Sequence, residues 1–436
     1  MSARLRGLLS VAVAVGLAAV AGAQARSATP SSAPAAASDA AAPTTRAPFD
    51  VKAATNAYLA KMSPGQRARS DAYFEGGYWL QLWDFLYAAA VALLLLALGW
   101  SARMRDLAQR VTRFKSVHAV LYWTQYLVAT TVLAFPLTVY EGFFREHKYG
   151  LATQSFGPWL GDQAKGLLVA LVMGSVLVTA LFAVVRNRGR SWWLWGAGVS
   201  AVFITLGALI APVFIFPLFN TYTKLSDPRV RDPILSLARA NGIDASDVYQ
   251  MDASRQTTRA SANVSGFLGT MRITLNDNLL NRSTPAEVQA VMGHEMGHYV
   301  LNHVYKGIFF FSVLFVAMFA YLRSALDWTI GRWGARWHLV GATDLAVLPL
   351  AVLLVSVFFF AFTPLLNTFI RAQENEADIF GLNASGQPDG FAEAILKLGE
   401  YRKMDPGPIE EWIFYDHPSG RARITAAMRW KAEHLP

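Results

Sequence analysis

The sequence predicts a mainly α-helical protein that crosses a membrane six or seven times and carries a polar domain built from helices and a small β-sheet. Composition supports this fold class, because the 436-residue chain is 54% hydrophobic and only 16% charged, whereas soluble domains contain about 25% charged residues. The positive mean hydropathy of +0.29 also indicates a membrane protein. The apolar residues also form separate segments of roughly 20 residues, the length that a helix needs to cross a bilayer.

The N-terminus has the pattern of a signal peptide. Arg4 and Arg6 precede an apolar run, which has small residues at Ala21, Ala23 and Ala25. A retained first transmembrane helix fits residues 1–25 as well, which gives the seventh possible crossing. Residues 26–50 are rich in Ala, Ser, Pro and Thr and predict a disordered linker. A short amphipathic helix is expected over 51–76.

Six further apolar segments predict transmembrane helices. Four of them belong to an N-terminal membrane domain over 51–219, and the last two form a hairpin over 307–367. The polar parts between and after them, 220–306 and 368–436, are expected to form one catalytic domain. Prolines within or at the ends of the segments predict kinks. The segments are 79–100, 118–143, 166–186, 192–219, 307–326 and 344–367, and the prolines are Pro136, Pro212, Pro217 and Pro364.

The polar region before the hairpin reads as alternating helices and strands. Residues 227–242 have helical periodicity with Gly242 as a cap, and 248–254 and 271–277 read as strands. The segment between these strands supplies a turn or a sheet edge. Ser283 or Thr284 then caps a helix that starts with a proline and has a glutamate in its first turn.

This helix carries His-Glu-x-x-His at His294, Glu295 and His298. Histidines four residues apart share one helical face, so both imidazoles can bind one zinc ion, and Glu295 lies beside it as a general base. The alternative is a pair of surface histidines. Because the chain has no cysteine, only His, Asp and Glu can complete the site. His303 does not lie at the spacing of a third histidine ligand.

The third ligand is predicted in FIRAQENEADIFG at 369–381. Glu374 would complete a His-His-Glu site, and Asp378, one turn later, would orient a ligand imidazole through its second nitrogen. Two apolar segments separate His298 from Glu374, and two crossings return the chain to the side where it started. The alternative is a solvated acidic helix start, which is the interpretation that we give Glu376.

Several motifs together resemble the type I CAAX prenyl protease family of integral-membrane zinc peptidases. They are HEMGH at 294–298 and ENEADIFG at 374–381, with likenesses at 135–166, 261–269 and 416–424, the last to a C-terminal His-Pro…Arg motif. Together they cover about residues 75–430. HtpX-type proteases share the zinc motifs but have fewer helices before them, and the four segments ahead of His294 favour the prenyl-protease family.

The resemblance implies one zinc ion per chain and helices that surround a water-filled chamber. It also implies roles that spacing alone does not give. Asn263 would hold the substrate backbone at a strand edge, and His417, assisted by Arg423, would stabilise the oxyanion. Arg371 would contact the metal ligands without binding the metal itself. For His417 and Arg423, a helix cap and a surface charge remain the alternatives.

The resemblance implies cleavage near the C-terminus of a prenylated or membrane-associated peptide. A quality-control protease of broad specificity is the alternative within the enzyme class, and a transporter or scaffold with structural zinc is the alternative outside it. The net charge of +9 comes without a basic recognition helix, so we expect the lipid bilayer and a peptide as partners, not nucleic acid.

Localisation follows from the same features. The leader indicates a multi-pass protein of a bacterial inner membrane. The loops at 101–115, 186–190 and 331–337 are all basic, which predicts a cytoplasmic position for them and the opposite face for the zinc domain. The resemblance instead implies a cytosolic site, and both orientations stay open.

Overall fold

The structure is a computed structural model that describes residues 49–265 and 271–435. The expected signal peptide or first transmembrane helix lies outside the described residues, as does nearly all of the expected linker. Within them, six helices are long and apolar enough to cross a membrane, as predicted. They are α3 (Pro64–Ala97), α5 (Lys115–Val139), α7 (Phe156–Asn187), α8 (Trp192–Ile210), α12 (His303–Trp333) and α13 (Leu348–Ser385).

Local signals explain where these helices depart from the predicted segments. The single amphipathic helix expected over 51–76 is two helices, α2 (Val51–Leu59) and the start of α3, because Ser63 and Gln66 form a capping box and Pro64 follows at the first helical position. The basic segment expected as a loop is a helix, α4 (Trp100–Val111), which begins after Gly99 at φ +65°.

Three of the four prolines predicted to cause kinks lie in or next to irregular helical turns, whereas Pro364 lies within the continuous helix α13. Pro136 lies one turn before the π-helix η1 (Tyr140–Arg145), which leads into α6 (Glu146–Lys148). Pro212 lies in a second π-helix, η3 (Ala211–Ile215). A proline cannot donate the helical hydrogen bond of its turn, so the backbone adjusts at these places.

The membrane core forms where α5, α7, α8 and the hairpin α12–α13 meet. Its largest buried side chains include Tyr122 and Trp123 of α5 and Leu350 of α13. Gly174 of α7 lies against the Trp123 ring, and a methyl group there would approach the ring to 2.3 Å. The absence of a side chain at this position therefore lets α5 and α7 pack closely.

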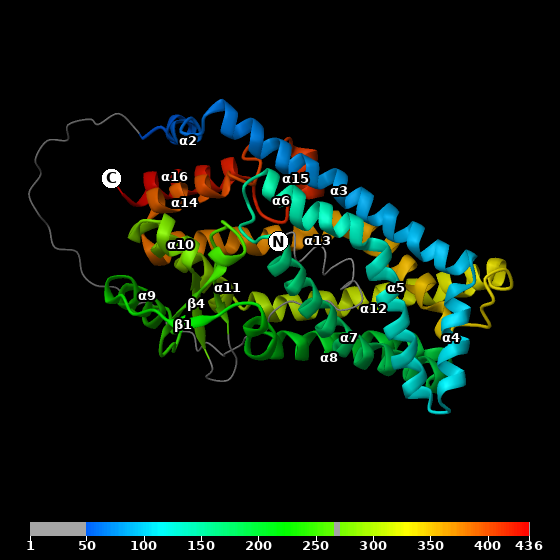
Figure 1. Cartoon of the computed structure of the whole chain (residues 1–436). Helices are drawn as coiled ribbons and strands as arrows, with labels where there is room; N and C mark the ends of the chain where they lie inside the picture. The colour runs from blue at the N-terminus through cyan, green and yellow to red at the C-terminus, as the bar shows by residue number, and fades with distance from the viewer. Residues whose placement is uncertain (1–48, 266–270, 436) are drawn as a thin grey trace, which may run out of the picture.

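A four-stranded sheet lies at one end of the helices (Figure 1). Its order is β1-β2-β4-β3, with β2 and β4 parallel and the outer pairs antiparallel. The predicted strands correspond to β2 and β4, β3 is the expected edge, and β1 was not predicted. Helix α9 (Pro228–Ala240) ends before Gly242 at φ +71°. The strands are β1 (Tyr222–Lys224), β2 (Val248–Met251), β3 (Ala262–Ser265) and β4 (Arg272–Asn276).

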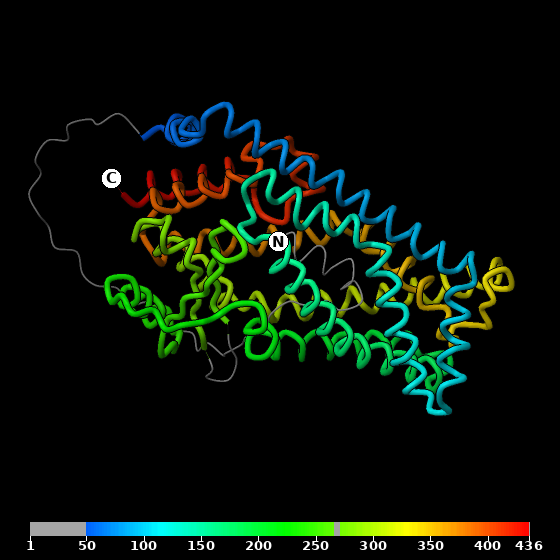
Figure 2. The backbone as a smooth tube through the Cα atoms, viewed as in Figure 1, coloured from blue at the N-terminus to red at the C-terminus, as the bar shows by residue number. Residues whose placement is uncertain are grey.

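The remaining helices surround the sheet end of the molecule. They are α10 (Asp277–Arg282), α11 (Pro285–Val300), α14 (Pro388–Leu398), α15 (Pro408–Phe414) and α16 (Gly420–His434). Met292 and Met296 of α11 pack against the sheet in one cluster, and Leu59 of α2 packs against α16 in another. Figure 2 shows α12 running away from this end and α13 returning to it. The predicted hairpin therefore brings the C-terminal half of α13 back to α11.

Candidate metal centre and active site

Helices α11 and α13 cross at glycines, which lets their backbones approach. A methyl group at Gly381 would lie 2.6 Å from the backbone nitrogen of His294, and one at Gly293 would lie 2.9 Å from the carbonyl oxygen of Gly381. Helix α11 itself starts at a capping box between Thr284 and Glu287, as predicted. The crossing places the acidic stretch of α13 beside the histidines of α11.

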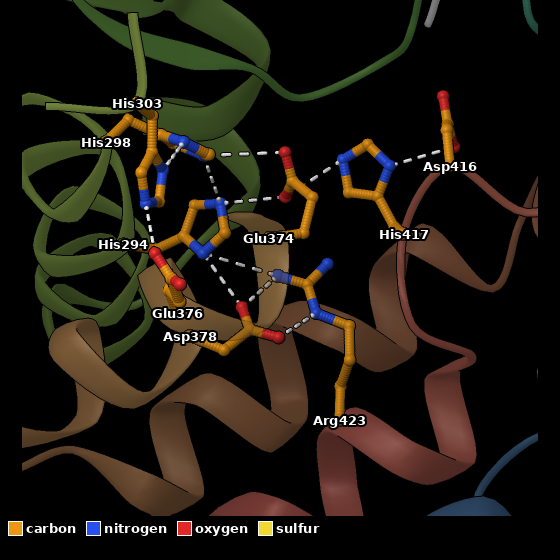
Figure 3. Close-up of polar contacts among 9 residues, drawn as sticks. All are labelled: His294, His298, His303, Glu374, Glu376, Asp378, Asp416, His417 and Arg423. Atoms are coloured by element: carbon orange, nitrogen blue, oxygen red, sulfur yellow. Dashed lines mark hydrogen bonds and ion pairs between the residues drawn. The ribbon is translucent and has the colours of Figure 1, made fainter. Parts of the chain in front are cut away.

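The three predicted metal ligands come together at this crossing (Figure 3). One ligand atom from each of His294, His298 and Glu374 lies within 4.8 Å of the other two. Nε2 of His294 is 3.3 Å from Glu374 Oε2, and Nε2 of His298 is 3.5 Å from Glu374 Oε1. Two imidazole nitrogens and a carboxylate are the donor set of many catalytic zinc sites.

The electrostatics of the cluster fit a bound cation. Burial opposes a charge on His294, but the carboxylates of Asp378 and Glu374 outweigh it and raise the pKa of this imidazole to about 10. Burial and the neighbouring His294 lower the pKa of His298 to about 3, so this ring is neutral. Glu374 Oε2 is buried and accepts no hydrogen bond within the described part of the chain. The site thus stabilises positive charge and leaves a carboxylate oxygen available as a ligand.

Asp378 fixes the first histidine, as predicted. Its Oδ1 lies 2.8 Å from His294 Nδ1, so Nδ1 carries the proton and Nε2 faces the other ligands. Arg423 then binds both oxygens of Asp378, at 2.8 Å from Nε and 2.5 Å from Nη2. Both side chains are buried, at 1% and 6% exposed. The resemblance implies that Arg423 assists His417, and in the structure its guanidinium binds Asp378, where it compensates the charge of the buried carboxylate.

The second histidine is held by two residues whose role the sequence did not indicate. Nδ1 of His298 lies 2.9 Å from Nδ1 of His303, and Nε2 of His303 lies 3.0 Å from Oε2 of Glu376. A carboxylate only accepts, so His303 donates from Nε2 and accepts at Nδ1. His298 therefore donates from Nδ1, which leaves its Nε2 for a metal. Lys306 completes the chain with an ion pair to Glu376 at 2.5 Å.

Glu376 is solvent-exposed, as interpreted, but it lies within α13 rather than at a helix start, and it binds both His303 and Lys306. His303, 4% exposed, is not in the ligand group, as expected. The fold brings it back to His298 because Asn302 between them adopts a left-handed backbone at φ +57° and separates α11 from α12. Asparagine tolerates this conformation better than most residues, so Asn302 is the feature of the sequence from which this turn could have been predicted.

Glu295 follows the ligand His294 on α11. It is half-buried and forms no hydrogen bond with any described residue. Burial, with a smaller contribution from Glu374, raises the pKa of Glu295 to about 7 against the opposing effect of His294. A carboxylate with such a pKa can take up and release a proton near neutral pH.

His417 reaches the cluster from the segment between α15 and α16. Its Nε2 is 3.1 Å from Glu374 Oε2, and its Nδ1 is 2.8 Å from Oδ1 of Asp416. Burial lowers the pKa of His417. Arg371 lies behind this segment, where its Nη1 donates to the carbonyl oxygens of Glu411 and Tyr415 at 3.0 and 2.6 Å. Arg371 therefore supports the segment that carries His417.

Asn263 lies on the edge strand of the sheet. It is exposed and pairs with Thr274 of β4, and the other side of β3 has no neighbouring strand within the described sheet. Helix α11 contacts β3. An extended peptide added to this edge would run beside the metal helix.

Comparisons with known proteins match nearly the whole described chain. Residues 52–221 match the family described as CAAX prenyl protease N-terminal, five membrane helices, and residues 224–431 match peptidase family M48. The first range contains four of the candidate spans together with the shorter α4.

Individual proteins agree with the family match. The chain is 30% identical over 361 residues to the uncharacterised metalloprotease YhfN of Bacillus subtilis, covering 81% of this chain and 84% of that protein. It is 26% identical over 318 residues to CAAX prenyl protease 1 of Saccharomyces cerevisiae, covering 68% and 69%. Its fold matches the crystal structure of Ste24p from S. mikatae with a TM-score of 0.73 at 20% identity, covering 86% and 94%. The chain therefore belongs to peptidase family M48 and is a multi-pass membrane metalloprotease.

Proposed function

We propose that the protein is a zinc-dependent endopeptidase that cleaves near the C-terminus of a lipidated or otherwise membrane-associated peptide. The convergence of His294, His298 and Glu374, with Glu295 beside them, is the observation that carries the proposal. Relatives named CAAX prenyl protease 1 support this substrate class. The similarity to a B. subtilis protein supports a bacterial source, and an inner membrane is the location that we propose.

Zinc suits the donor set because it binds imidazole nitrogen and carboxylate oxygen readily and leaves a position open in catalytic sites. His294, His298 and Glu374 would hold it. When bound, zinc supplies Lewis acidity that makes water nucleophilic near neutral pH. The chain's own residues carry out the remaining tasks.

Proton transfer falls to Glu295. Its free carboxylate would take a proton from the attacking water and deliver it to the leaving amine, and its pKa of about 7 suits both steps. His417 lies across the cluster with Nε2 toward Glu374. Burial lowers the pKa of the resting ring, but negative charge that develops on the substrate carbonyl oxygen would favour protonation of Nε2, which would then donate a hydrogen bond to that oxygen.

Substrate positioning falls to the sheet edge and the membrane helices. The side chain of Asn263 and the free edge of β3 would hold the peptide backbone in an extended form beside α11. In the most apolar 18-residue stretch of each span, at most 33% of the residues are buried. Most of each helix surface is therefore available to lipid or to the enclosed chamber that the family resemblance implies.

The test compares wild-type protein with Glu295→Gln and Glu374→Ala, purified in detergent. We expect Glu295→Gln to keep one zinc per chain and to lose cleavage by about 10²–10⁴-fold, the usual contribution of a general base. Glu374→Ala should lose both zinc and cleavage. Zinc content by mass spectrometry and cleavage of a fluorogenic CAAX peptide are the measurements.

Matched peptides test the substrate class. We expect faster cleavage of a farnesylated CAAX peptide than of the same peptide without the lipid. Equal rates, with comparable cleavage of an unfolded polypeptide, would establish the broad-specificity alternative. Normal cleavage by Glu295→Gln would overturn the catalytic mechanism.

A further inference from the structure

A second polar site lies at the opposite end of the helices from the metal centre. It is a pocket of about 540 Å³ between α4, the start of α5, the end of α7 and the segment that precedes α13. This volume is within the range of ligand pockets, roughly 300–1,000 Å³. In Figure 1, α4 lies at the end of the molecule away from the sheet and α11.

The ends of the candidate spans place this pocket at the level of the lipid headgroups. One span begins at Lys115, another ends at Asn187, and a third begins at Leu345. The pocket is lined by Lys115 and Leu345 themselves and by Arg186, next to Asn187. Polar residues at the end of an apolar span lie in the interfacial layer, where phospholipids carry their phosphates.

The charge of the pocket is positive, and most of its cations are available. Its two carboxylates, Asp106 and Asp344, are both bound by Arg105, at 2.9 and 2.6 Å. The other three cations, Arg113, Lys115 and Arg186, form no ion pair among the described residues. Arg105 thus holds the pocket together, whereas the other three side chains can bind an anion.

Exposed apolar side chains lie on the elements that form this pocket, although of these only Val340 lines the pocket itself. Leu107, Val111 and Phe114, in and just after α4, are 52%, 64% and 60% exposed, and Val340 on the opposite wall is 86% exposed. A basic helix with exposed apolar residues at the end of membrane spans is suited to the bilayer interface. The same exposed side chains would contact acyl chains below a headgroup.

We propose that this pocket binds the phosphate of an anionic phospholipid in the leaflet opposite the catalytic domain. Arg113 and Lys115 contact the phosphate oxygens from the α4–α5 side, and Arg186 contacts them from α7. The guanidinium groups suit phosphate because they donate two parallel hydrogen bonds to it. The position of the pocket at the ends of the apolar spans, with exposed Val340 in its wall, favours a lipid over a soluble phosphate, because acyl chains would lie along the spans.

The experiment measures lipid binding to the full-length protein in detergent. Native mass spectrometry records the affinity for phosphatidylglycerol, phosphatidylcholine and inorganic phosphate. The test variant is Arg113→Gln/Lys115→Gln/Arg186→Gln. The control, Arg110→Gln/Arg332→Gln/Arg336→Gln, removes the same charge from positions at this end that do not line the pocket.

We expect wild type to prefer phosphatidylglycerol over phosphatidylcholine. Each basic residue near an anionic lipid strengthens binding roughly fivefold, so the test variant should bind phosphatidylglycerol about 100-fold more weakly, and the control should bind it like wild type. Equal binding by the test variant and wild type would overturn the proposal. Inorganic phosphate that binds as tightly as the lipid, or an equal loss in the control, would do so as well.

The proposal also predicts a result that does not depend on the triple variant folding. Arg186→Gln alone should weaken phosphatidylglycerol binding about fivefold. Melting temperatures without added lipid verify that each variant is folded. An unchanged affinity in folded Arg186→Gln would remove α7 from the site and overturn the assignment.

Discussion

Individual residues hold the two metal-binding histidines by different means. His294 donates to Asp378, a buried carboxylate bound on both oxygens by Arg423. His298 donates to a neutral imidazole, His303, whose partner Glu376 has a side chain that is 48% exposed. Water can compete for the hydrogen bonds of the exposed Glu376, whereas it does not reach those of the buried Asp378. The orientation of His298 should therefore be the more easily perturbed of the two.

The first residue-scale prediction concerns Glu376→Ala. Loss of this carboxylate frees His303 to change its tautomer, so His298 no longer has a fixed hydrogen-bond acceptor. Partners of metal ligands typically contribute 10–100-fold to metal affinity, and we expect a loss of about tenfold for this exposed partner. Zinc retention against a competing chelator is the measurement.

The matched control is Glu393→Ala, which removes another exposed carboxylate paired with a lysine, Lys61, away from the metal centre. Its metal affinity should equal that of wild type. Equal affinities in Glu376→Ala and wild type would show that His303 needs no partner to orient His298.

At the residue scale, the sequence predicts which side chains lie together where they are spaced along one helix. His294, Glu295 and His298 share one motif, and Glu374 and Asp378 share one face of another helix. The contact between His298 and His303 depends on the backbone at Asn302, and spacing rules for ligands do not describe such a turn. The contacts of Arg371 and Arg423 depend on tertiary packing between α13 and the C-terminal segments.

At the scale of elements, the metal centre depends on the closeness of α11 and α13. The ligands come from both helices, so any change in the distance between their axes separates Glu374 from the histidines. Glycines occupy the crossing on both sides, Gly293 on α11 and Gly381 on α13. Sequence analysis predicted both helices and the starting cap of α11, but the role of these glycines becomes evident only from the crossing.

Gly381→Ala tests this closeness. The added methyl group would meet the backbone of His294 at 2.6 Å, and a backbone atom cannot move aside as a side chain does. Overpacking of this kind costs about 1–3 kcal/mol, and the helices must also separate. We expect a lower melting temperature and at least a tenfold loss of zinc affinity.

Gly307→Ala on α12 is the matched control, because its methyl group would have no atom within 4 Å. There the alanine should be neutral or should stabilise the helix by about 0.5–1 kcal/mol. Wild-type zinc affinity in Gly381→Ala would show that the crossing tolerates a wider separation than its geometry indicates.

At the scale of the whole molecule, the membrane domain (52–221) and the peptidase region (224–431) must keep a fixed position relative to each other. The even number of crossings between His298 and Glu374 predicted that the hairpin closes the metal centre, and in the structure α12 runs away from the sheet end and α13 returns to it. The contacts that join the membrane domain to the peptidase region were not predicted, because they link helices and loops that are distant in sequence. A buried cluster of Tyr73, Glu146 and Arg259 is the clearest of them.

In this cluster the membrane domain supplies Tyr73 and Glu146, and the peptidase region supplies Arg259. Arg259 Nη2 lies 2.7 Å from both Glu146 Oε2 and the Tyr73 hydroxyl, and that hydroxyl donates to Glu146 Oε1 at 2.7 Å. Backbone contacts reinforce the junction nearby, where residue 152 bridges to residue 257. The cluster contains none of the metal ligands.

Glu146→Ala should therefore destabilise the protein and leave zinc affinity unchanged. Removal of one partner of a buried ion pair typically costs about 3–5 kcal/mol, because the other charge stays buried without compensation. The double variant Glu146→Leu/Arg259→Met removes both charges and should recover much of the lost melting temperature. Glu400→Gln, which breaks an exposed pair with Arg282, should cost no more than about 1 kcal/mol. If Glu146→Ala and Glu400→Gln melt at the same temperature, the cluster does not couple the two regions, and the junction must depend on the backbone bridge and its neighbours.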